Sequence, residues 1–234
     1  MKKLITLAAA GFLLAANAMA LPGLEFSAGG FAGIYKPSLK TLNDKVLLYD
    51  HQTGMGSALQ YGGRIMVGLP LGLGGGVDLG YWSQTKEWND DQLDQHSIKA
   101  RLKPLDFFVQ YSIPIVPAVL KGKAGVSAGN VWADLDISET RTGQWSHYFN
   151  SEGSAATFGL FGGLDLVALP KFNLSAEVGY KMGGVDRLTI KASHEPDDVG
   201  DILEYYDHDK EQVLPLPMEL NGVTAKLVLT YIFF

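Results

Sequence analysis

The feature that most constrains this chain is a two-residue alternation of apolar and polar side chains, repeated in segments of about ten residues. Segment 172–182 is the clearest example, because its apolar residues alternate with Asn173, Ser175, Glu177 and Lys181. Successive side chains of a β-strand point to opposite faces, so this period predicts a strand with one apolar and one polar face.

The same pattern predicts eight strands in all. They cover residues 24–35, 58–68, 73–83, 96–111, 119–137, 154–167, 172–190 and 221–234. The connections alternate between two kinds. Short apolar turns that contain Pro lie at 69–72, 112–118 and 168–171, and long polar loops lie at 36–57, 84–95, 138–153 and 191–217. In the fourth strand the apolar phase slips by one residue at Pro104, which we interpret as a β-bulge.

We interpret this pattern as an all-β fold, an eight-stranded antiparallel up-and-down transmembrane β-barrel with short periplasmic turns and long extracellular loops. Two alternatives remain open. A soluble lipocalin-type barrel would alternate in the same way with its apolar face inward, and ten strands would result if loop 36–57 or 191–217 contained a hairpin. Aromatic residues near strand ends favour the membrane barrel, since they predict interfacial girdles. They are Tyr35, Tyr81, Trp82, Tyr111, Trp132, Phe172, Tyr231 and Phe233.

Composition excludes several classes. The formal net charge of −6 argues against a nucleic-acid partner, which would require a basic surface. The chain has no Cys, so no disulfide framework is possible. No internal segment reaches the roughly 18 consecutive apolar residues that a membrane-spanning helix needs.

The first twenty residues form a separate segment. Lys2 and Lys3 precede an apolar stretch, and Ala18-Met19-Ala20 has the small-residue pattern of a cleavage site. We therefore predict a secretory signal peptide at 1–20 and a mature barrel domain at 21–234.

The cleavage pattern, the eight alternating segments and the aromatic C-terminus together resemble the small outer-membrane β-barrels of Gram-negative bacteria, the OmpA/OmpX/OmpW-like group. The resemblance implies location in the cell outer membrane as a monomer, with membrane lipid and lipopolysaccharide as surroundings. It also implies that the last strand is recognised by the barrel-assembly machinery. Tyr231 and Phe233 match the family's aromatic spacing, and Phe234 is one residue extra.

If the apolar faces meet lipid, charged residues on the other faces enter the lumen. Five are basic and four acidic: Arg64, Asp78, Asp106, Lys121, Lys123, Asp165, Glu177, Lys181 and Lys226. An eight-stranded barrel has room for side chains and at most one small ligand, and enclosed charges must pair or stay hydrated. We expect a structural ion-pair network, in which Lys226 would pair with Glu177 or Asp165. The alternative is a narrow polar path, which inward Gly residues would leave open.

The predicted loops carry two further features. Five histidines, His51, His96, His147, His194 and His208, lie in or beside the loops, but their spacing matches no metal signature. Loop residues 194–211 carry eight acidic residues against Lys210, and the apolar residues among them have helical spacing. We interpret this stretch as a solvated acidic loop, with a divalent-cation site that bridges to lipopolysaccharide as the alternative.

These features predict a structural or surface-interaction role with a largely filled lumen. A passive OmpW-like channel for small or apolar molecules is the alternative, and an outer-membrane lipase or deacylase is a third. Ser146-His147 and Ser193-His194 are adjacent pairs, and neighbours along a chain rarely form a catalytic relay. We therefore expect no enzyme activity, no cofactor and no metal site.

Overall fold

The computed structural model describes residues 24–47, 53–89, 94–117, 119–141, 145–169 and 171–233. The predicted signal peptide at 1–20, His51 and Phe234 lie outside the described residues. Within these ranges, no helix has the length and apolarity needed to cross a membrane.

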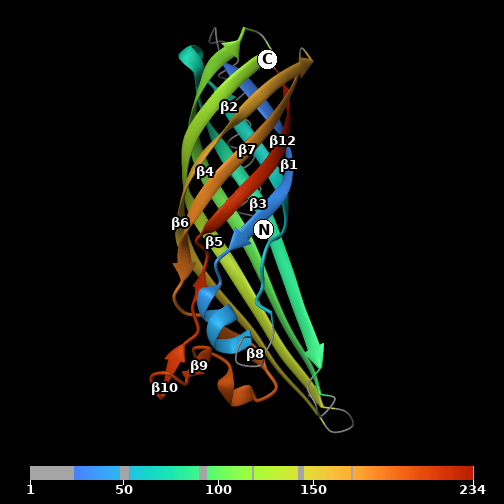
Figure 1. Cartoon of the computed structure of the whole chain (residues 1–234), viewed down its shortest axis with the longest axis vertical. Coiled ribbons are helices and arrows are strands. Elements are labelled where there is room, and N and C mark those ends of the chain that lie inside the picture. The colour runs from blue at the N-terminus through green and yellow to red at the C-terminus, as the bar shows by residue number, and fades with distance from the viewer. Residues whose placement is uncertain are drawn as a thin grey trace.

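Eight antiparallel strands close into a barrel (Figure 1). Each strand is hydrogen-bonded to its sequence neighbours, and the last pairs with the first. The strands are β1 (Glu25–Pro37), β2 (Ala58–Gly68), β3 (Leu73–Asn89), β4 (Gln95–Val116), β5 (Leu120–Arg141), β6 (Trp145–Leu169), β7 (Phe172–Val185) and β12 (Gly222–Ile232). The predicted eight-stranded up-and-down barrel is confirmed.

Closure rests on β12, which lies between β7 and β1. Its pairing with β1 runs from Ser27 opposite Ile232 to Pro37 opposite Gly222, and its pairing with β7 runs from Lys181 to Phe172. In lipid no water is present to satisfy a free strand edge, so only a closed ring can span. The terminal strand is therefore the element that completes the barrel.

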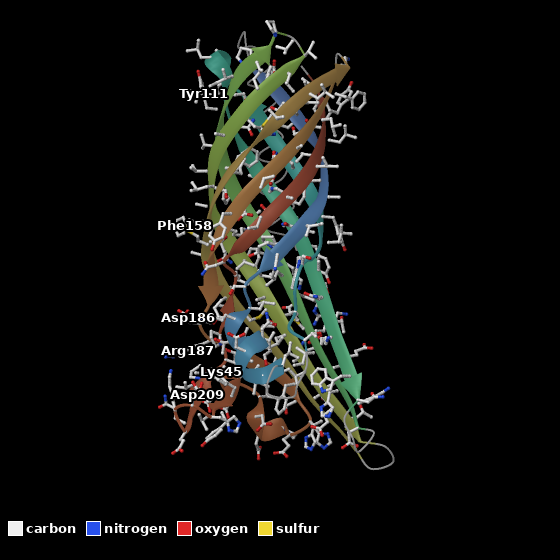
Figure 2. All side chains as sticks on the ribbon, viewed as in Figure 1. Lys45, Tyr111, Phe158, Asp186, Arg187 and Asp209 are labelled. Atoms are coloured by element: carbon white, nitrogen blue, oxygen red, sulfur yellow. The ribbon has the colours of Figure 1, made fainter. Side chains whose placement is uncertain are left out.

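Over much of the barrel the apolar side chains point outward. Leu59, Tyr61 and Ile65 on β2 are between 50% and 61% exposed, while the inward Arg64 is 3% exposed. Figure 2 shows Tyr111 and Phe158 directed away from the barrel. Exposed apolar faces on consecutive strands form a belt that water would not tolerate, which excludes the lipocalin-type alternative.

At Pro104 the apolar side of β4 changes from the outside to the inside. Phe107 and Val109 are exposed outward, whereas Ile98 and Leu102 on the opposite face are 1–2% exposed. The register between β4 and β5 is continuous here, with Pro104 opposite Val131, so the predicted bulge is wrong. The phase slip in the sequence marks a change of surroundings. On the loop side of Pro104, which includes Ile98 and Leu102, the strand has left the lipid and packs on an apolar interior.

That interior is an apolar core inside the end of the barrel that carries the long loops. It consists of Tyr35, Leu39, Leu42, Leu47, Met55, Trp82, Ile98, Ala100, Leu102, Val131, Ala133, Leu135, Val185, Leu188, Ile190, Leu203, Leu216, Met218 and Leu220. The Trp82 indole donates a hydrogen bond to the carbonyl of Tyr35 over 3.1 Å, and the Tyr35 hydroxyl donates to the carbonyl of Leu220. The prediction that Tyr35 and Trp82 belong to interfacial girdles is therefore wrong.

Two of the predicted loops are mainly strand. β3 continues to Asn89 and β4 begins at Gln95, while β5 continues to Arg141 and β6 begins at Trp145. In Figure 1 these hairpins project from the barrel at the lower right. Their outer face is polar, and cross-strand contacts support it: Arg101 lies 2.5 Å from Asp136, and Lys103 lies 2.7 Å from Asp134. In these extensions the apolar side chains face the core and the polar side chains face water. The prediction searched for strands with an apolar face toward lipid, and it therefore assigned these residues to loops.

The other two loops fold over the apolar core. The first contains the π-helix η1 (Leu42–Leu47). The second contains β8 (Thr189–Ser193), the 3₁₀-helix η3 (Pro196–Asp198), β9 (Glu204–Asp207), β10 (Gln212–Pro215) and β11 (Met218–Glu219). The hairpin β9–β10 is a separate two-stranded sheet, so the barrel has eight strands and not ten. The apolar residues with helical spacing within 194–211 form no α-helix, and Tyr206 among them lies in β9.

The turn between β2 and β3 depends on left-handed backbone conformations. Leu71 has φ 67° and Gly72 has φ 82°, within η2 (Pro70–Gly72). The N–H of Leu69 donates to the carbonyl of Leu73 over 2.8 Å, so Pro70, Leu71 and Gly72 form a three-residue hairpin loop, in which a Gly at positive φ is common. The predicted turn at 69–72 is confirmed, whereas β4 extends to Val116 and takes up most of the turn predicted at 112–118.

Leu102→Ala should lower the free energy of unfolding by about 2–5 kcal/mol, because it leaves a cavity in the apolar core. It should also speed cleavage of the loop end by added protease. Leu79→Ala is the matched control: Leu79 is 52% exposed on the outer face of β3, where lipid fills the space. Protease protection in reconstituted vesicles is the measurement, and equal sensitivity of the two variants would contradict the apolar core.

Candidate functional site

The centre of the lumen is organised around Arg64 on β2, which binds two carboxylates. Its Nε lies 2.6 Å from Asp78 Oδ1 and its Nη2 lies 2.8 Å from Asp78 Oδ2. The same guanidinium donates to both oxygens of Glu177, with Nη2 3.0 Å from Oε2. Paired N–H donors match a carboxylate in plane, so these contacts hold β2, β3 and β7 together.

Two lysines extend this network across the lumen. Lys123 Nζ on β5 lies 2.6 Å from Asp165 and 2.7 Å from Glu177. Lys226 Nζ on β12 lies 2.8 Å from Asp78 and 3.6 Å from Glu177. Glu177 therefore contacts three cations from three strands. Of the two partners expected for Lys226, the structure places Glu177 beside it, while Asp165 pairs with Lys123.

A second pair lies nearer the loops. Lys181 Nζ on β7 is 2.6 Å from Asp106 Oδ2 on β4, and the Thr157 hydroxyl is 3.3 Å from Asp106 Oδ1. Both charged side chains are largely buried. This pair joins opposite walls of the barrel, β4 and β7, which are not neighbours in the sheet.

Aromatic rings fill the space around the ion pairs. Arg64 lies over the ring of Phe108 at 4.5 Å, and Lys226 lies over the ring of Phe31 at 4.8 Å. Phe108 meets Phe161 edge to face at 6.0 Å. These rings occupy the hollows left by inward glycines: a Cβ on Gly62 would lie 2.6 Å from Phe31. The glycines thus accommodate packing, rather than the open path considered from the sequence.

Burial shows how tightly this level of the lumen is closed. The side chains of Arg64, Lys123 and Glu177 are 1–3% exposed. Water therefore hardly reaches them. Toward the loops the apolar core fills the same cross-section, so the lumen is occupied at two successive levels.

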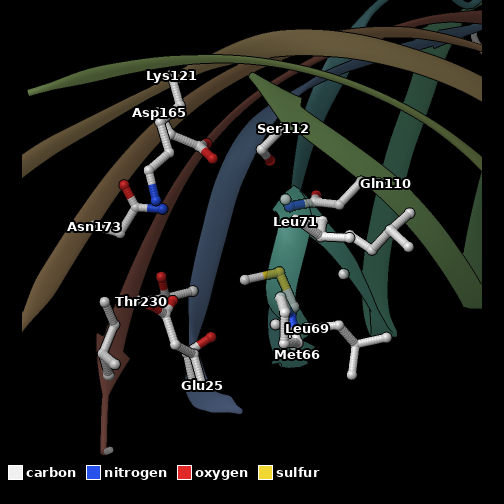
Figure 3. Close-up of a pocket in the computed structure, with 17 residues that line it drawn as sticks. Glu25, Met66, Leu69, Leu71, Gln110, Ser112, Lys121, Asp165, Asn173 and Thr230 are labelled. Atoms are coloured by element: carbon white, nitrogen blue, oxygen red, sulfur yellow. The ribbon is translucent and has the colours of Figure 1, made fainter. Parts of the chain in front are cut away.

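One residue of the predicted lumen set stays outside the network. Lys121 on β5 is half-buried and has no ion pair among the described residues. It lines a cavity of about 290 Å³ at the periplasmic end, next to Asp165 and Asn173 (Figure 3). The other eight residues of the set are brought together in pairs or in the central network.

A second charged cluster joins the two folded loops at the opposite end. Lys45 of η1 lies 3.2 Å from Asp207 at the end of β9 and also contacts Asp209 (Figure 2). Hydrogen bonds that Lys45 donates to Asp209 and Asp207 raise the pKa of Lys45. Burial opposes ionisation of Asp207, but the hydrogen bond from Lys45 outweighs it and lowers the pKa of Asp207. We name this contact the loop latch.

The four histidines of the described residues lie at three separate places. His147 meets His194 at 5.1 Å between ring centroids, while His96 stacks on Trp88 and His208 packs against Tyr206. Within the described part of the chain, no group of three or more His, Cys, Asp or Glu is placed to hold a metal ion.

The Ser193-His194 sequence shows no relay geometry. The Ser193 hydroxyl donates to Asp198 Oδ2 over 2.9 Å and accepts from the backbone N–H of Glu195. A nucleophilic serine would instead donate to a histidine that acts as its base.

The terminal aromatics cluster at the periplasmic rim. Phe172 meets Tyr231 at 5.2 Å, Tyr231 meets Phe233 at 5.1 Å, and Phe233 meets Phe26 at 5.6 Å. The backbone N–H of Phe233 also donates to the carbonyl of Phe26 over 2.9 Å. These contacts tie the last residues of β12 to the start of β1.

Sequence reasoning missed the inward aromatics and the loop latch. Phe31, Phe108 and Phe161 look like any other strand residues, and only the register shows that each faces a glycine on an adjacent strand. The latch joins Lys45 to residues more than 160 positions later, so nothing local signals it.

An apolar belt, a closed ring of strands and a charged, filled lumen together define an integral membrane β-barrel of the outer-membrane type. Such barrels are located in the bacterial outer membrane, and the belt places the chain in contact with membrane lipid.

No family model matches the chain, and no curated protein matches it. Solved barrels resemble it in shape. Neisserial surface protein A is 14% identical with a TM-score of 0.44, and the match covers 91% of this chain and 97% of that one. Outer membrane protein OprG from Pseudomonas aeruginosa is 11% identical with a TM-score of 0.47, covering 90% and 96%. A major outer membrane protein from Thermus thermophilus is 11% identical with a TM-score of 0.47, covering 90% and 99%. The class assigned above rests on the geometry of the chain itself.

Glu177→Gln should lower the free energy of unfolding by about 3–5 kcal/mol, because it leaves buried cations without their shared carboxylate. Glu204→Gln, on an exposed strand of the loop hairpin, is the control and should change stability little. Urea unfolding in lipid vesicles measures both. Equal stability of the two variants would show that the central network does not hold the strands.

The loop latch should open in acid. The pKa of Asp207 is lowered below its unfolded value of about 3.9. The contact therefore contributes stability above that value and loses it as the pH falls through the lower, folded value. Because the chain has no Cys, spin labels on Cys introduced at Lys40 and Gln212 can report the distance between the loops. The distribution of distances between the two labels should broaden below about pH 4. In Asp207→Asn it should be broad already at pH 7.

If the distance distribution stayed the same in acid and in Asp207→Asn, the latch would not be what holds the loops together. Asp197→Asn, which removes an exposed carboxylate from the same loop, is the control and should leave the neutral-pH distance unchanged.

Proposed function

We propose that this outer-membrane barrel has a structural and surface-interaction role and does not conduct solutes. The observation that carries the proposal is the double filling of the lumen. The side chains of Arg64, Lys123 and Glu177 are only 1–3% exposed, and the apolar core around Trp82 and Leu102 lies on the loop side of them. A solute path would have to displace both.

The loop end supports an interaction surface. It is a folded unit, held by its own apolar core and by the loop latch, so its outer residues are kept in fixed positions. On the β9–β10 hairpin, Tyr206 and Val213 lie opposite each other and are 47% and 57% exposed. Acidic residues of the same loop lie near them in the sequence, and one of these, Asp209, is 80% exposed. Exposed apolar side chains rimmed by charge are typical of protein contacts.

Two further partners are part of the proposal. The polar outer face of the projecting hairpins, with Trp132 and Lys103 about half exposed, is suited to lipopolysaccharide head groups. The aromatic cluster of Tyr231 and Phe233, which Phe234 follows in the sequence, is suited to recognition by the barrel-assembly machinery. An enzyme role gains no support, because the Ser193 hydroxyl donates to Asp198 rather than to a histidine.

Reconstituted in planar bilayers, the protein should give no conductance above the lipid background, because both levels of the lumen are filled. An open porin reconstituted in parallel is the positive control. In cells that lack the protein, the wild-type chain should restore envelope resistance to detergents. Steady single-channel currents, or detergent resistance that does not depend on the protein, would contradict the proposed role.

A further inference from the structure

The outer face of the barrel has a groove where β1 meets β12, two strands that lie side by side in Figure 1. Its floor includes the outward residues Gly30 and Ala32 of β1. Their register partners on β12, Leu229 and Leu227, are 53% and 60% exposed and form one wall. Tyr61 of β2, which is 50% exposed, forms the other wall beside Ala32. Small residues between large ones therefore leave a hollow over the closing seam. We name it the seam groove.

Packing inside the barrel does not account for the small outward residues at the seam groove. Gly29 faces inward, and a Cβ there would lie 1.9 Å from the carbonyl oxygen of Leu229, so closure of the ring requires this glycine. Gly63 lies opposite Gly30 on the outer face. A Cβ on Gly63 would lie 3.8 Å from its nearest neighbour, which is an ordinary contact. The chain could therefore carry larger side chains beside the groove.

The size and lining of the seam groove fit a hydrocarbon chain. Its volume is about 690 Å³, within the roughly 300–1,000 Å³ of sites for organic ligands. Phe172 and Leu174 of β7, each 39% exposed, extend the apolar lining across β12. Lipid tails are as apolar as these side chains, so filling the groove gains van der Waals contact rather than hydrophobic free energy. Selection of one lipid therefore needs a further contact at the head group.

A cation at the periplasmic end of the seam groove can supply that contact. Lys171 directly precedes β7, and its carbonyl accepts the N–H of Ile232 over 2.8 Å. The Lys171 Nζ atom lies 6.0 Å from the ring centre of Tyr231, which lines the groove. Lys171 is exposed and forms no ion pair within the described part of the chain. The carboxylate of Glu25 at the same rim lines the inner cavity instead.

We propose that the seam groove binds one phospholipid of the periplasmic leaflet, with an acyl chain along the floor and the phosphate at Lys171. Lysines at the membrane surface attract anionic lipid in this way. A second barrel is a poorer occupant. A symmetric contact would bring the same patch from both copies, hence two lysines, and the described lining of the groove holds no acidic residue to balance them. The site is independent of the role proposed for the loops.

Native mass spectrometry of the full-length barrel, released from uncharged detergent micelles, tests the proposal. The probes are a phosphatidylglycerol and a diacylglycerol that has the same acyl chains but no phosphate. Phosphatidylglycerol should saturate a first site at one lipid per barrel. Diacylglycerol should bind about fivefold more weakly, which is the typical contribution of one lysine to binding an anionic membrane surface.

Lys171→Gln tests the head-group contact. It should weaken binding of phosphatidylglycerol about fivefold and leave binding of diacylglycerol unchanged, because only the first probe carries a phosphate. Lys191→Gln is the matched control. Lys191 is an exposed lysine of β8, at the loop end of the barrel, so its loss should change neither affinity.

Ala32→Leu tests the groove itself. The larger side chain fills part of the floor, so both probes should bind more weakly. Ala124→Leu is the matched control, because it adds the same atoms to an exposed outward position of β5, opposite Tyr111. Resistance of the barrel to unfolding in dodecyl sulfate shows that each variant is folded. If Ala32→Leu does not fold, the comparison of wild type with Lys171→Gln still decides the proposal.

Lipid adducts that increase without saturating at one per barrel would overturn the proposal, as would equal affinity of the wild type and Lys171→Gln for phosphatidylglycerol. A barrel dimer that Ala32→Leu abolishes, with lipid binding unchanged, would assign the groove to a second copy and would also overturn it.

Discussion

The pairing of β12 with β1 is the contact on which the rest of the structure depends. It converts a sheet with two free edges into a ring in which every strand has two neighbours. Only then can the outer face be apolar along its length, because no backbone group in the belt is left for water to satisfy. Closure also creates the lumen, and with it the need to balance the charges that point inward. The central ion-pair network around Glu177 balances these charges and joins β2, β3, β5, β7 and β12 across the interior.

The barrel is built from two halves with opposite polarity. In the lipid-spanning half the outside is apolar and the inside holds ion pairs. In the loop half the inside is apolar and the outside carries ion pairs such as Lys103 with Asp134. The same strands pass through both halves without a change of register, as the pairing of Pro104 with Val131 shows. A strand can do this because its two faces are independent, so each face can match a different environment at each height.

Much of the fold could be predicted from the sequence, since the belt produces regular alternation. The eight strands, their order and the turn at Leu71 and Gly72 follow from local pattern and turn chemistry. The loop half could not be predicted in the same way. Its core brings together Leu42, Leu102 and Leu203, and local sequence does not show that distant segments share one interior. Alternation also does not show which face of a strand is inside the barrel. When the apolar residues of β4 changed face at Pro104, the pattern therefore looked like the one-residue slip of a bulge.

The candidate site was predictable in membership but not in arrangement. The nine charged lumen residues follow from the face of each strand that is opposite the apolar one. Which of them form ion pairs depends on which strands face each other across the barrel. Lys121 and Lys123 are two residues apart on the same face of β5, and only the three-dimensional arrangement shows that Lys123 reaches two carboxylates. The inward phenylalanines are a further case, because their space exists only where a glycine lies beside them.

The central claim is that β4 keeps one register while its surroundings change at Pro104. Nitroxide scanning of residues 98 to 111 in lipid vesicles tests it most directly, with oxygen as the lipid-soluble relaxant and a nickel chelate as the water-soluble one. Odd-numbered positions should be accessible throughout, to the nickel chelate at Lys99 and Lys103 and to oxygen at Phe107 and Val109. Ile98, Ala100 and Leu102 should be shielded from both. Oxygen accessibility at these three even-numbered positions would contradict the account, because it would place a bulge at Pro104 and lipid where the apolar core is described.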